Sequence, residues 1–250
     1  MYTKVKTEAE IKNMRVAGKM LAQVLQHVKN RATAGMSTQD LADRARDELE
    51  QLGGAPSFLN YQGFPDVLCV SVNDEVVHGI PNKLNILEDG DVVSIDFGVT
   101  WKGMVTDAAL TFTIGEVEPK VKKLIATTER ALMAGIDACK AGIRVGDIAS
   151  AIQKVLDAEH YGIVRDLVGH GVGHELHEDP NIPNFGHAGS GPVLQKGMTI
   201  AIEPMATLGD YHVTMDQDGW TIRSKDHSLA AHFEHTILIT DKGAEILTTL

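Results

Sequence analysis

Apolar residues recur at helical spacing in four segments of the chain. The first segment follows Thr7 and Glu10, which have the spacing of a capping box, and the second ends at the paired glycines Gly53 and Gly54. The apolar face of the first segment consists of Ile11, Met14, Leu21, Val24 and Val28. The pattern predicts helices over about 7–30, 37–52, 119–140 and 146–160.

Strand-like segments, rich in β-branched residues and bounded by turn residues, follow each pair of predicted helices. In the first part of the chain we expect strands at about 67–72, 76–79, 92–99 and 104–114. In the last part we expect them near 163–168, 198–203, 211–214, 220–223 and 232–240. No linker, low-complexity tract or run of charges divides the chain. The sequence therefore predicts one α+β domain over residues 1–250, with helices covering a mixed, largely antiparallel sheet.

The order of elements repeats, because two helices followed by strands occur twice. Residues 34–42 read AGMSTQDLA and residues 141–149 read AGIRVGDIA. Both have Ala-Gly and an apolar residue, then three variable positions, then Asp, an aliphatic residue and Ala. This match predicts two similar halves, about 7–115 and 118–245, packed as one pseudo-symmetric domain. Chance reuse of a similar loop is the alternative.

Composition and charge narrow the possible partners. The 23 basic and 34 acidic residues give a net charge of −11, which argues against nucleic acid or an anionic membrane as a bulk electrostatic partner. No window approaches 18 apolar residues, and the N-terminus lacks the apolar stretch of a signal peptide. The two cysteines, Cys69 and Cys139, are far apart and do not suggest a disulfide framework. We expect a cytoplasmic protein.

Two aspartates, Asp96 and Asp107, lie in apolar, β-prone segments eleven positions apart (VSIDFGVTWKGMVTDAALTF, 93–112). If the two predicted strands form a hairpin with its turn between Trp101 and Lys102, the aspartates are directly opposed, with Cβ atoms about 5 Å apart. Two bare carboxylates at that distance repel each other, and a divalent cation removes the conflict. The alternative is that one aspartate faces solvent or caps a turn.

The last part of the chain supplies further candidate ligands. GHGVGHELHEDP (169–180) places histidines among glycines, but it is neither an HExxH zinc helix nor a GxGxxG loop. Glu203 and Glu234 lie inside the apolar segments MTIAIEPM (198–205) and AAHFEHTILIT (231–241). Two aspartates, two glutamates and a histidine form an oxygen-rich set that suits two divalent ions of the Mn, Fe or Co type better than structural zinc. Such centres activate water in aminopeptidases and phosphatases.

The motifs HGIP (78–81), DFG (96–98), TDAALTF (106–112), GHGVGHELHEDP, IEPM (202–205) and FEHT (233–236) occur in this order. Together they resemble those of the type I (bacterial-type) methionine aminopeptidases, and the likeness covers about residues 5–248. The resemblance implies the pita-bread (creatinase/aminopeptidase) fold, with pseudo-two-fold halves of paired helices and antiparallel sheet. It also implies a metal-dependent hydrolase that removes the initiator methionine from nascent proteins and peptides with a small second residue.

The resemblance also assigns roles to individual residues. The implied metal ligands of two divalent ions (Co, Mn, Fe or Zn) are Asp96, Asp107, His170, Glu203 and Glu234. Asp107 and Glu234 are expected to bridge the ions, Asp96 to serve one, and His170 with Glu203 to serve the other. The implied catalytic residues are Glu203 as general base, His78 near the leaving amide nitrogen, and His177 at the scissile carbonyl oxygen.

The implied methionine pocket consists of Tyr61, Phe64, Cys69, Leu176 and Trp220, with His78 and His177 also contacting substrate. Leu176 stands where bacterial relatives often carry Phe, and Phe58 stands where many carry Cys. Ordinary core packing is the alternative role for Tyr61, Phe64 and Trp220. Four histidines match no ligand position of the family, and we expect them to be structural or to contact the ligands from outside the site: His174, His187, His232 and His235.

Two other functions compete with this interpretation. Xaa-Pro peptidases share the pita-bread fold but usually carry an additional N-terminal domain, which 250 residues scarcely accommodate. A pita-bread protein without catalysis would serve as a binding module, but all five ligand positions and both accessory histidines are present here. We expect nascent polypeptide N-termini as partners, with the ribosome as one place of encounter. We expect no nucleic acid and no membrane as partners, and a monomer.

Overall fold

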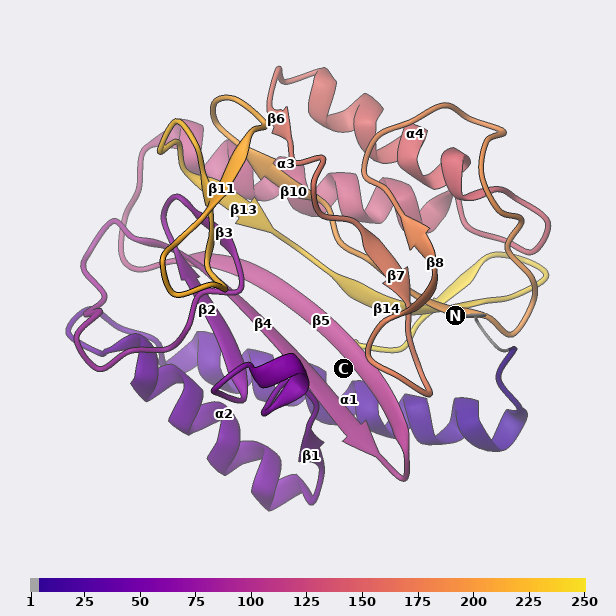
Figure 1. Ribbon diagram of the computed structural model, residues 1–250, viewed down its shortest axis with the longest axis horizontal. Coiled ribbons are helices and arrows are strands. Elements are labelled where there is room, and N and C mark those ends of the chain that lie inside the picture. The colour runs from indigo at the N-terminus through magenta and orange to yellow at the C-terminus, as the bar shows by residue number, and fades with distance from the viewer. Residues whose placement is uncertain (1–4) are drawn as a thin grey trace.

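The computed structural model describes residues 5–250, and its helices lie in two pairs on opposite sides of antiparallel strands (Figure 1). Helices α1 (Glu8–Arg31) and α2 (Thr38–Leu52) contact the strands of the first part of the chain. Helices α3 (Pro119–Asp137) and α4 (Val145–Asp157) contact those of the last part. The four helices match the four predicted from apolar spacing. The first four positions of the predicted 1–250 domain lie outside the described residues.

The first two helices begin where the sequence pattern places them. The Thr7 hydroxyl accepts a hydrogen bond from the Glu10 backbone N–H (3.3 Å), and the Glu10 carboxylate accepts one from the Thr7 backbone N–H (2.7 Å). Ser37 and Asp40 form the same reciprocal pair at the start of α2. Each capping box satisfies backbone donors that the first helical turn leaves unpaired. Gly53 ends α2 in the left-handed conformation (φ 78°), as the glycine pair predicts.

All paired strands in the described residues are antiparallel, and they form four sheets. The first has the order β1-β4-β2 with β5 paired to β4, and consists of β1 (Ala55–Pro56), β2 (Leu68–Val72), β4 (Val92–Trp101) and β5 (Met104–Thr113). The largest has the order β15-β14-β9-β7-β8, and consists of β7 (Gly169–Gly171), β8 (Glu178–Ile182), β9 (Thr199–Ile202), β14 (His235–Ile239) and β15 (Ala244–Ile246).

Two smaller sheets complete the strand layer. One has the order β13-β10-β6, with β6 (Gly162–Ile163), β10 (Met205–Thr207) and β13 (Ala230–His232). The other has the order β11-β12-β3, with β3 (Glu75–Val77), β11 (Val213–Met215) and β12 (Ile222–Ser224). Because β3 precedes β11 and β12 by more than a hundred residues, this sheet joins the two parts of the chain. A short 3₁₀ helix, η1 (Tyr61–Gly63), lies beside the strand layer (Figure 1).

A second junction between the two parts runs along β5. The Glu234 backbone N–H donates to the Ala109 carbonyl (2.9 Å), and the Ala109 N–H donates to the Glu234 carbonyl (3.3 Å). The Thr236 hydroxyl donates to the Asp107 carbonyl (2.8 Å) and accepts from the Asp107 N–H (2.9 Å). These four bonds hold Asp107 and Glu234 next to each other, although 127 positions separate them in the sequence.

Two predicted strands differ from the structure. The segment predicted as one strand over 232–240 is divided into β13 and β14, because Glu234 between them bonds to β5 rather than continuing either ladder. The strand predicted over 163–168 stops at Ile163, since its partner β10 offers only three residues. Both differences depend on which backbone N–H and C=O groups of distant segments lie within hydrogen-bond distance. The residue types along a segment do not determine this.

Each helix pair packs its own apolar core. Buried side chains of the first core come from α1, α2, β2 and β4, and include Leu21, Val24, Leu41, Leu49, Ile95 and Phe97. Those of the second come from α3, α4, β9 and β14, and include Leu132, Ile148, Ile152, Ile200 and Ile237. None of the helices within residues 5–250 combines the length and apolar character needed to cross a membrane. The internal duplication and its boundaries stay a prediction.

Candidate metal centre

Asp96 on β4 and Asp107 on β5 face the same side of a hairpin, but they are not directly opposed. Asp96 pairs with Ala109, and Asp107 pairs with Gly98. The two carboxylates are therefore diagonal neighbours, and the predicted direct pairing was wrong. Because the register differs by two residues, the side chains still share one face of the sheet.

The hairpin turn explains the difference in register. Lys102 and Gly103 both have positive φ, 48° and 77°, and the strand pairing closes at Trp101 and Met104. Two positive φ angles give a two-residue turn whose twist matches the strands, and glycine at the second position adopts this conformation without steric cost. The turn is therefore centred one position later than predicted.

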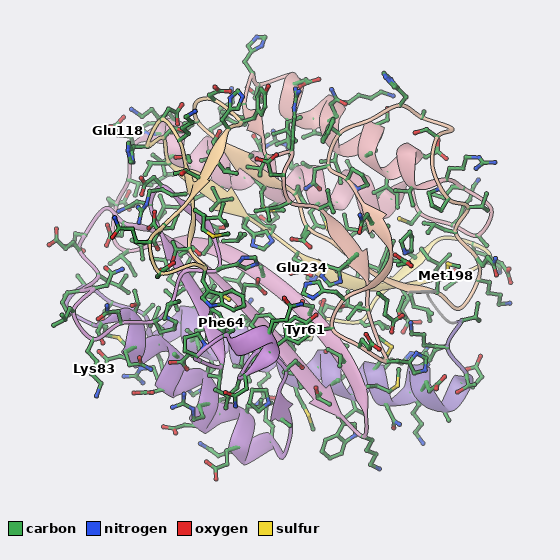
Figure 2. All side chains as sticks on the ribbon, viewed as in Figure 1. Tyr61, Phe64, Lys83, Glu118, Met198 and Glu234 are labelled. Atoms are coloured by element: carbon green, nitrogen blue, oxygen red, sulfur yellow. The ribbon has the colours of Figure 1, made fainter. Side chains whose placement is uncertain are left out.

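Three further acidic and imidazole groups meet the aspartate pair from the other part of the chain. His170 lies on β7 opposite Ala201 of β9, and Glu203 directly follows β9. His170 Nε2 is 3.8 Å from Asp107 Oδ2 and 3.5 Å from Glu203 Oε1. Ligand atoms of Asp107, His170 and Glu234 all lie within 4.8 Å of one another. The structure thus brings all five predicted ligands into one cavity, and Figure 2 shows Glu234 at the centre of the molecule.

The four carboxylates have no lysine or arginine within ion-pair distance among residues 5–250. Burial, followed by repulsion from the neighbouring acids, raises the pKa of Asp107 and Glu234 well above the usual range. Burial and then repulsion from Asp96 do the same to the pKa of Glu203, and burial raises the pKa of Asp96 to about 7. Without a cation, the site therefore holds protons that carboxyl groups ordinarily release.

Divalent cations fit this donor set. One oxygen each of Asp96, Asp107 and Glu234 is buried without a hydrogen-bond partner in the described part of the chain. An unsatisfied buried acceptor costs about 1–3 kcal/mol, so three in one cavity require a compensating partner. Hard carboxylate oxygens with one imidazole nitrogen suit ions such as Mn, Fe, Co or Zn, and a bound ion satisfies the free oxygens and offsets the negative charge.

His170 is prepared to act as a ligand. Its Nδ1 lies 2.9 Å from the Gly171 carbonyl oxygen, so Nδ1 carries the proton that it donates to this oxygen. The Nε2 lone pair therefore faces Asp107 and Glu203. Burial, and then the nearby His177, lower the pKa of His170 to about 3, which keeps the imidazole neutral. A backbone carbonyl that fixes the tautomer of a ligating histidine is a common feature of metal sites.

The two predicted accessory histidines also reach the cavity. His177 Nδ1 lies 2.8 Å from the Tyr61 hydroxyl, and the ring centroids of His177 and His170 are 4.3 Å apart. When the Tyr61 hydroxyl donates this hydrogen bond to Nδ1, the proton of the neutral imidazole lies on Nε2. This Nε2–H can then donate a hydrogen bond to another acceptor. His78 has a positive φ of 59°, and burial lowers the pKa of its imidazole to about 4. Burial also lowers the pKa of His177.

The cavity has a volume of about 160 Å³. The carboxylates and histidines form one wall, and an apolar wall consists of Phe58, Tyr61, Phe64, Cys69, Leu176 and Trp220. Phe64 and Trp220 meet edge to face with centroids 5.2 Å apart. Figure 2 shows Tyr61 and Phe64 close to Glu234. All five predicted pocket residues line the cavity, as does Gln62, which the sequence interpretation did not include.

A buried ion pair that the sequence interpretation missed holds the loop carrying Leu176 and His177. Lys6 Nζ lies 2.6 Å from Glu178 Oε2, and the two side chains are 0% and 4% exposed. Glu178 Oε1 accepts hydrogen bonds from the backbone N–H groups of His174 (2.6 Å) and Glu175 (3.1 Å). The sequence signal was the acid directly after His177, but its partner lies 172 positions away.

The four histidines without an assigned role have different surroundings. His174 Nε2 lies 2.8 Å from Glu10 Oε1, and His235 Nδ1 lies 2.8 Å from the Thr248 hydroxyl. His187 is exposed. His232 is buried, with its Nε2 3.6 Å from Glu203 Oε2. Only His232 among these four lies within ion-pair distance of a predicted ligand in the described residues.

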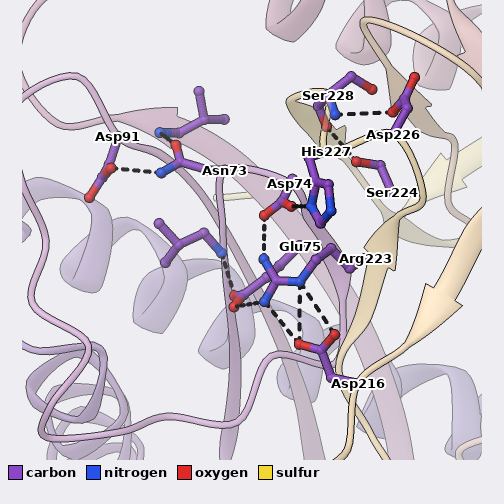
Figure 3. A network of polar contacts seen from close by, with 12 residues as sticks. Asn73, Asp74, Glu75, Asp91, Asp216, Arg223, Ser224, Asp226, His227 and Ser228 are labelled. Atoms are coloured by element: carbon purple, nitrogen blue, oxygen red, sulfur yellow. Dashed lines mark hydrogen bonds and ion pairs between the residues drawn. The ribbon is translucent and has the colours of Figure 1, made fainter.

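A polar network next to the cavity ties β3 to the β11–β12 hairpin (Figure 3). The Arg223 guanidinium on β12 binds three carboxylates, those of Asp74, Glu75 and Asp216. These contacts raise the pKa of the guanidinium well above its usual value, with the hydrogen bond to Asp216 the largest cause. Trp220 lies in the turn between Asp216 and Arg223, so the network fixes both ends of the segment that carries this pocket residue.

Comparison with known proteins agrees with this geometry. The family model for metallopeptidase family M24 matches residues 12–241. A methionine aminopeptidase of Clostridium acetobutylicum is 44% identical over 244 residues, which is 98% of each chain. The crystal structure of a methionine aminopeptidase from Thermotoga maritima superposes with a TM-score of 0.98 at 45% identity, covering 99% of this chain and 100% of that one.

A more distant likeness concerns the fold alone. A prolidase from Pyrococcus furiosus superposes with a TM-score of 0.80 at 23% identity. The match covers 99% of this chain but 66% of the prolidase. These neighbours share the pita-bread architecture that the resemblance implied.

Proposed function

Since the chain belongs to metallopeptidase family M24, we propose that its cavity removes the initiator methionine from nascent proteins and peptides whose second residue is small. Relatives at 44% identity over nearly the full length are methionine aminopeptidases, and the chain is a metal-dependent aminopeptidase of this bacterial type. One observation carries the detailed proposal. Four buried or half-buried carboxylates, without a lysine or arginine partner among residues 5–250, lie beside a neutral histidine, opposite an apolar wall.

We assign two divalent ions to the site, held by Asp96, Asp107, His170, Glu203 and Glu234. Four carboxylates carry more negative charge than one divalent ion offsets, which supports two ions over one. When bound, such ions supply Lewis acidity and make a water molecule acidic enough to react near neutral pH. The oxygen-rich set accommodates Mn, Fe, Co or Zn, and the donor chemistry does not select among them.

The side chains around the ions have distinct tasks in this proposal. Glu203 accepts a proton from the attacking water and later delivers it to the leaving amine, the role of a general base and acid. His177 donates a hydrogen bond from its Nε2–H to the scissile carbonyl oxygen, where negative charge develops in the transition state. The Tyr61 hydroxyl on Nδ1 supports the tautomer that this donation requires. His78 also lines the cavity, and we assign it a position near the leaving nitrogen.

The apolar wall suits the side chain of methionine. Phe64, Trp220 and Leu176 provide aromatic and aliphatic surface, and Cys69 adds a polarisable sulfur. Thioethers pack favourably against aromatic rings and adapt to irregular gaps. Leu176, 5% exposed, and Phe58, 7% exposed, both contribute to this wall despite their departure from the family pattern.

The biological setting forms part of the proposal. We propose that the substrates are nascent polypeptide N-termini met at or after the ribosome, in the cytoplasm, and that the enzyme acts as a monomer. Two observations support the cytoplasmic part of this setting: both cysteines are buried and unpaired, and the net charge of −11 disfavours anionic membranes as partners.

The test uses protein stripped of metal by a chelator and reloaded with Mn²⁺ or Co²⁺. We expect methionine release from Met-Ala-Ser, slower release from Met-Trp-Ser, and little cleavage of an Xaa-Pro peptide. Glu203→Ala should lower kcat at least roughly 10²-fold, the usual contribution of a general base. Faster cleavage of the Xaa-Pro peptide, or an unchanged rate in Glu203→Ala, would contradict the proposal. Light scattering of the purified protein tests the monomer.

A further inference from the structure

His232 is a buried histidine whose ring nitrogens have no hydrogen-bond partner in the described residues. It ends β13 and is 1% exposed. Neither Nδ1 nor Nε2 has a hydrogen-bond partner within residues 5–250. Buried polar atoms in native proteins are nearly always satisfied, and each one left free costs about 1–3 kcal/mol. We therefore expect the His232 ring to have a hydrogen-bond partner in the active, metal-bound enzyme.

The backbone around His232 is firmly held. The His232 N–H donates to the Thr111 hydroxyl (2.9 Å), and that hydroxyl donates to the His232 carbonyl (2.7 Å). His232 is also paired with Met205 in the β10–β13 ladder. Because successive side chains of an extended segment alternate between faces, His232 and Glu234 point to the same side, and Phe233 packs into the second apolar core.

Glu203 is the acidic group that faces the His232 ring. His232 Nε2 lies 3.6 Å from Glu203 Oε2, and His170 Nε2 lies 3.5 Å from the other oxygen, Oε1. Each carboxylate oxygen of Glu203 thus has its own imidazole. The Asn184 side-chain amide donates to the Glu203 carbonyl (3.0 Å), so the backbone of Glu203 is fixed and only its side chain is free to rotate.

His232 does not reach substrate. It is absent from the cavity wall, which Glu203 forms in front of it. A small rotation of the Glu203 carboxylate shortens the 3.6 Å separation to hydrogen-bond length. Groups behind a metal ligand commonly orient it in this way, and their loss costs 10–100-fold in metal affinity or activity.

We propose that His232 is a positioning residue for Glu203: its Nε2–H binds Glu203 Oε2, fixing the rotation of the carboxylate and directing Oε1 toward the metal site and the substrate. This inference rests on the proposed role of Glu203 as ligand and general base. It assigns a function to one of the histidines for which neither the sequence pattern nor the family resemblance provided one.

Two substitutions at His232 distinguish the loss of the hydrogen-bond donor from a change in side-chain volume. His232→Leu keeps an apolar side chain of similar size and removes the donor, whereas His232→Gln keeps an N–H donor of similar reach. His235→Gln is the matched control, since His235 is half-buried and faces Thr248 on the other side of the segment. Each variant is measured for kcat and KM with Met-Ala-Ser, for Mn²⁺ affinity by calorimetry, and for Tm without metal.

His232→Leu should lower kcat roughly 10–100-fold with KM changed less than about twofold, and should weaken Mn²⁺ binding about tenfold. His232→Gln should recover both to within about threefold of the unmodified protein. Without metal, the Tm of His232→Leu should equal or exceed that of the unmodified protein, because the change removes two unsatisfied buried atoms. His235→Gln should leave kcat and Mn²⁺ affinity unchanged.

Three results would overturn the inference. His232→Leu with unchanged kcat and Mn²⁺ affinity excludes a positioning role. His232→Gln no better than His232→Leu shows that ring shape, and not the donor, matters. If His232→Leu lowers the metal-free Tm so far that unfolding accounts for the lost activity, His232 is a purely structural residue. If the unmodified protein itself fails to cleave Met-Ala-Ser with Mn²⁺ or Co²⁺, the proposed function fails, whereas Mn²⁺ affinity still reports on His232.

Discussion

Lys6 Nζ lies 2.6 Å from Glu178 Oε2, and both side chains are almost completely buried. Glu178 in turn accepts hydrogen bonds from the backbone at His174 and Glu175. The loop that presents Leu176 and His177 to the cavity is therefore attached to the segment before α1. Burial lowers the pKa of Lys6, and the bond to Glu178 opposes this shift.

Lys6→Met should lower both stability and kcat. Removing one partner of a buried pair leaves an uncompensated charge and typically costs about 3–5 kcal/mol. At this chain length that lowers Tm by roughly 2–4 °C per kcal/mol. The freed Glu178 loosens the loop, so kcat should fall roughly tenfold even at temperatures where the variant is fully folded.

Arg15→Met is the control for this experiment. Arg15 joins α1 to Glu245 by an ion pair whose side chains are 43% and 40% exposed, and neither residue belongs to the loop. Exposed pairs contribute only about 0–1 kcal/mol, so its Tm and kcat should change little. A Lys6→Met protein with full kcat would show that the ion pair does not position His177.

Asp96→Asn should weaken metal binding and stabilise the metal-free protein. Amide oxygen is a poorer ligand for a hard cation than carboxylate oxygen. Without metal, ionised Asp96 is a buried charge near other acids, and its replacement removes that cost. Calorimetry with Mn²⁺ should show at least roughly tenfold weaker affinity, and metal-free Tm at pH 8 should rise by roughly 2–4 °C. Unchanged affinity would contradict the ligand role.

The stability of the metal-free protein should fall between about pH 4 and pH 7 because of Asp96. The folded pKa of this carboxyl, about 7, lies above its unfolded value of 3.8, so the folded state holds the proton more tightly. The stabilising contribution is complete below the unfolded pKa and is lost as pH rises through the folded one. Comparing Tm against pH for metal-free Asp96→Asn and unmodified protein isolates this effect. Parallel curves would show that Asp96 does not titrate in this range.

Bound metal should reverse this pH dependence. Cations and protons compete for the same carboxylates, so Mn²⁺ affinity and activity should both decline as pH falls below about 7. Calorimetry at several pH values in buffers of different ionisation enthalpy counts the protons released on binding. Binding without proton release would contradict raised pKa values in the metal-free site.

His177→Ala should reduce kcat by roughly 10²–10³-fold, the loss expected when one donor to a developing oxyanion is removed. KM should change little, because the hydrogen bond strengthens mainly in the transition state. Tyr61→Phe should have a smaller effect in the same direction, since it removes only the hydroxyl 2.8 Å from His177 Nδ1. An effect of His177→Ala confined to KM would assign this histidine to ground-state binding.

Arg223→Met should raise KM more than it lowers kcat. Without the guanidinium, Asp74, Glu75 and Asp216 repel one another and the turn carrying Trp220 loosens, whereas the metal ligands keep their strands. We expect KM for Met-Ala-Ser to rise roughly tenfold, equivalent to about 1.4 kcal/mol of lost binding. Arg46→Met, which removes a guanidinium bound to Asp43 and Asp66, is the control for the loss of an arginine. A fall in kcat at constant KM would contradict a role in holding the pocket.

The sequence alone predicted the helices, the strand-rich segments and the five candidate ligands. Apolar spacing and capping residues are local signals, so α1 and α2 begin at Thr7 and Ser37 as expected. Acidic residues inside apolar segments indicate a need for compensation wherever those segments lie in the fold. For this reason Asp96 and Glu234 are recognisable as candidate ligands from their local surroundings. Family motifs then selected His170 among the histidines of 169–180 and added the individual roles.

The tertiary structure decided everything that depends on distance between remote residues. The turn at Lys102 and Gly103 moved the hairpin register by two residues, and backbone bonds between Ala109 and Glu234 divided a predicted strand. The residue types along these segments predict neither the hairpin register nor the division of the strand. The partner of Glu178, Lys6, became visible only in the folded chain, because a buried polar group is satisfied by whatever the packing brings within about 3 Å. The approach of His232 to Glu203, at 3.6 Å, likewise depends on packing between segments that are not adjacent in the sequence.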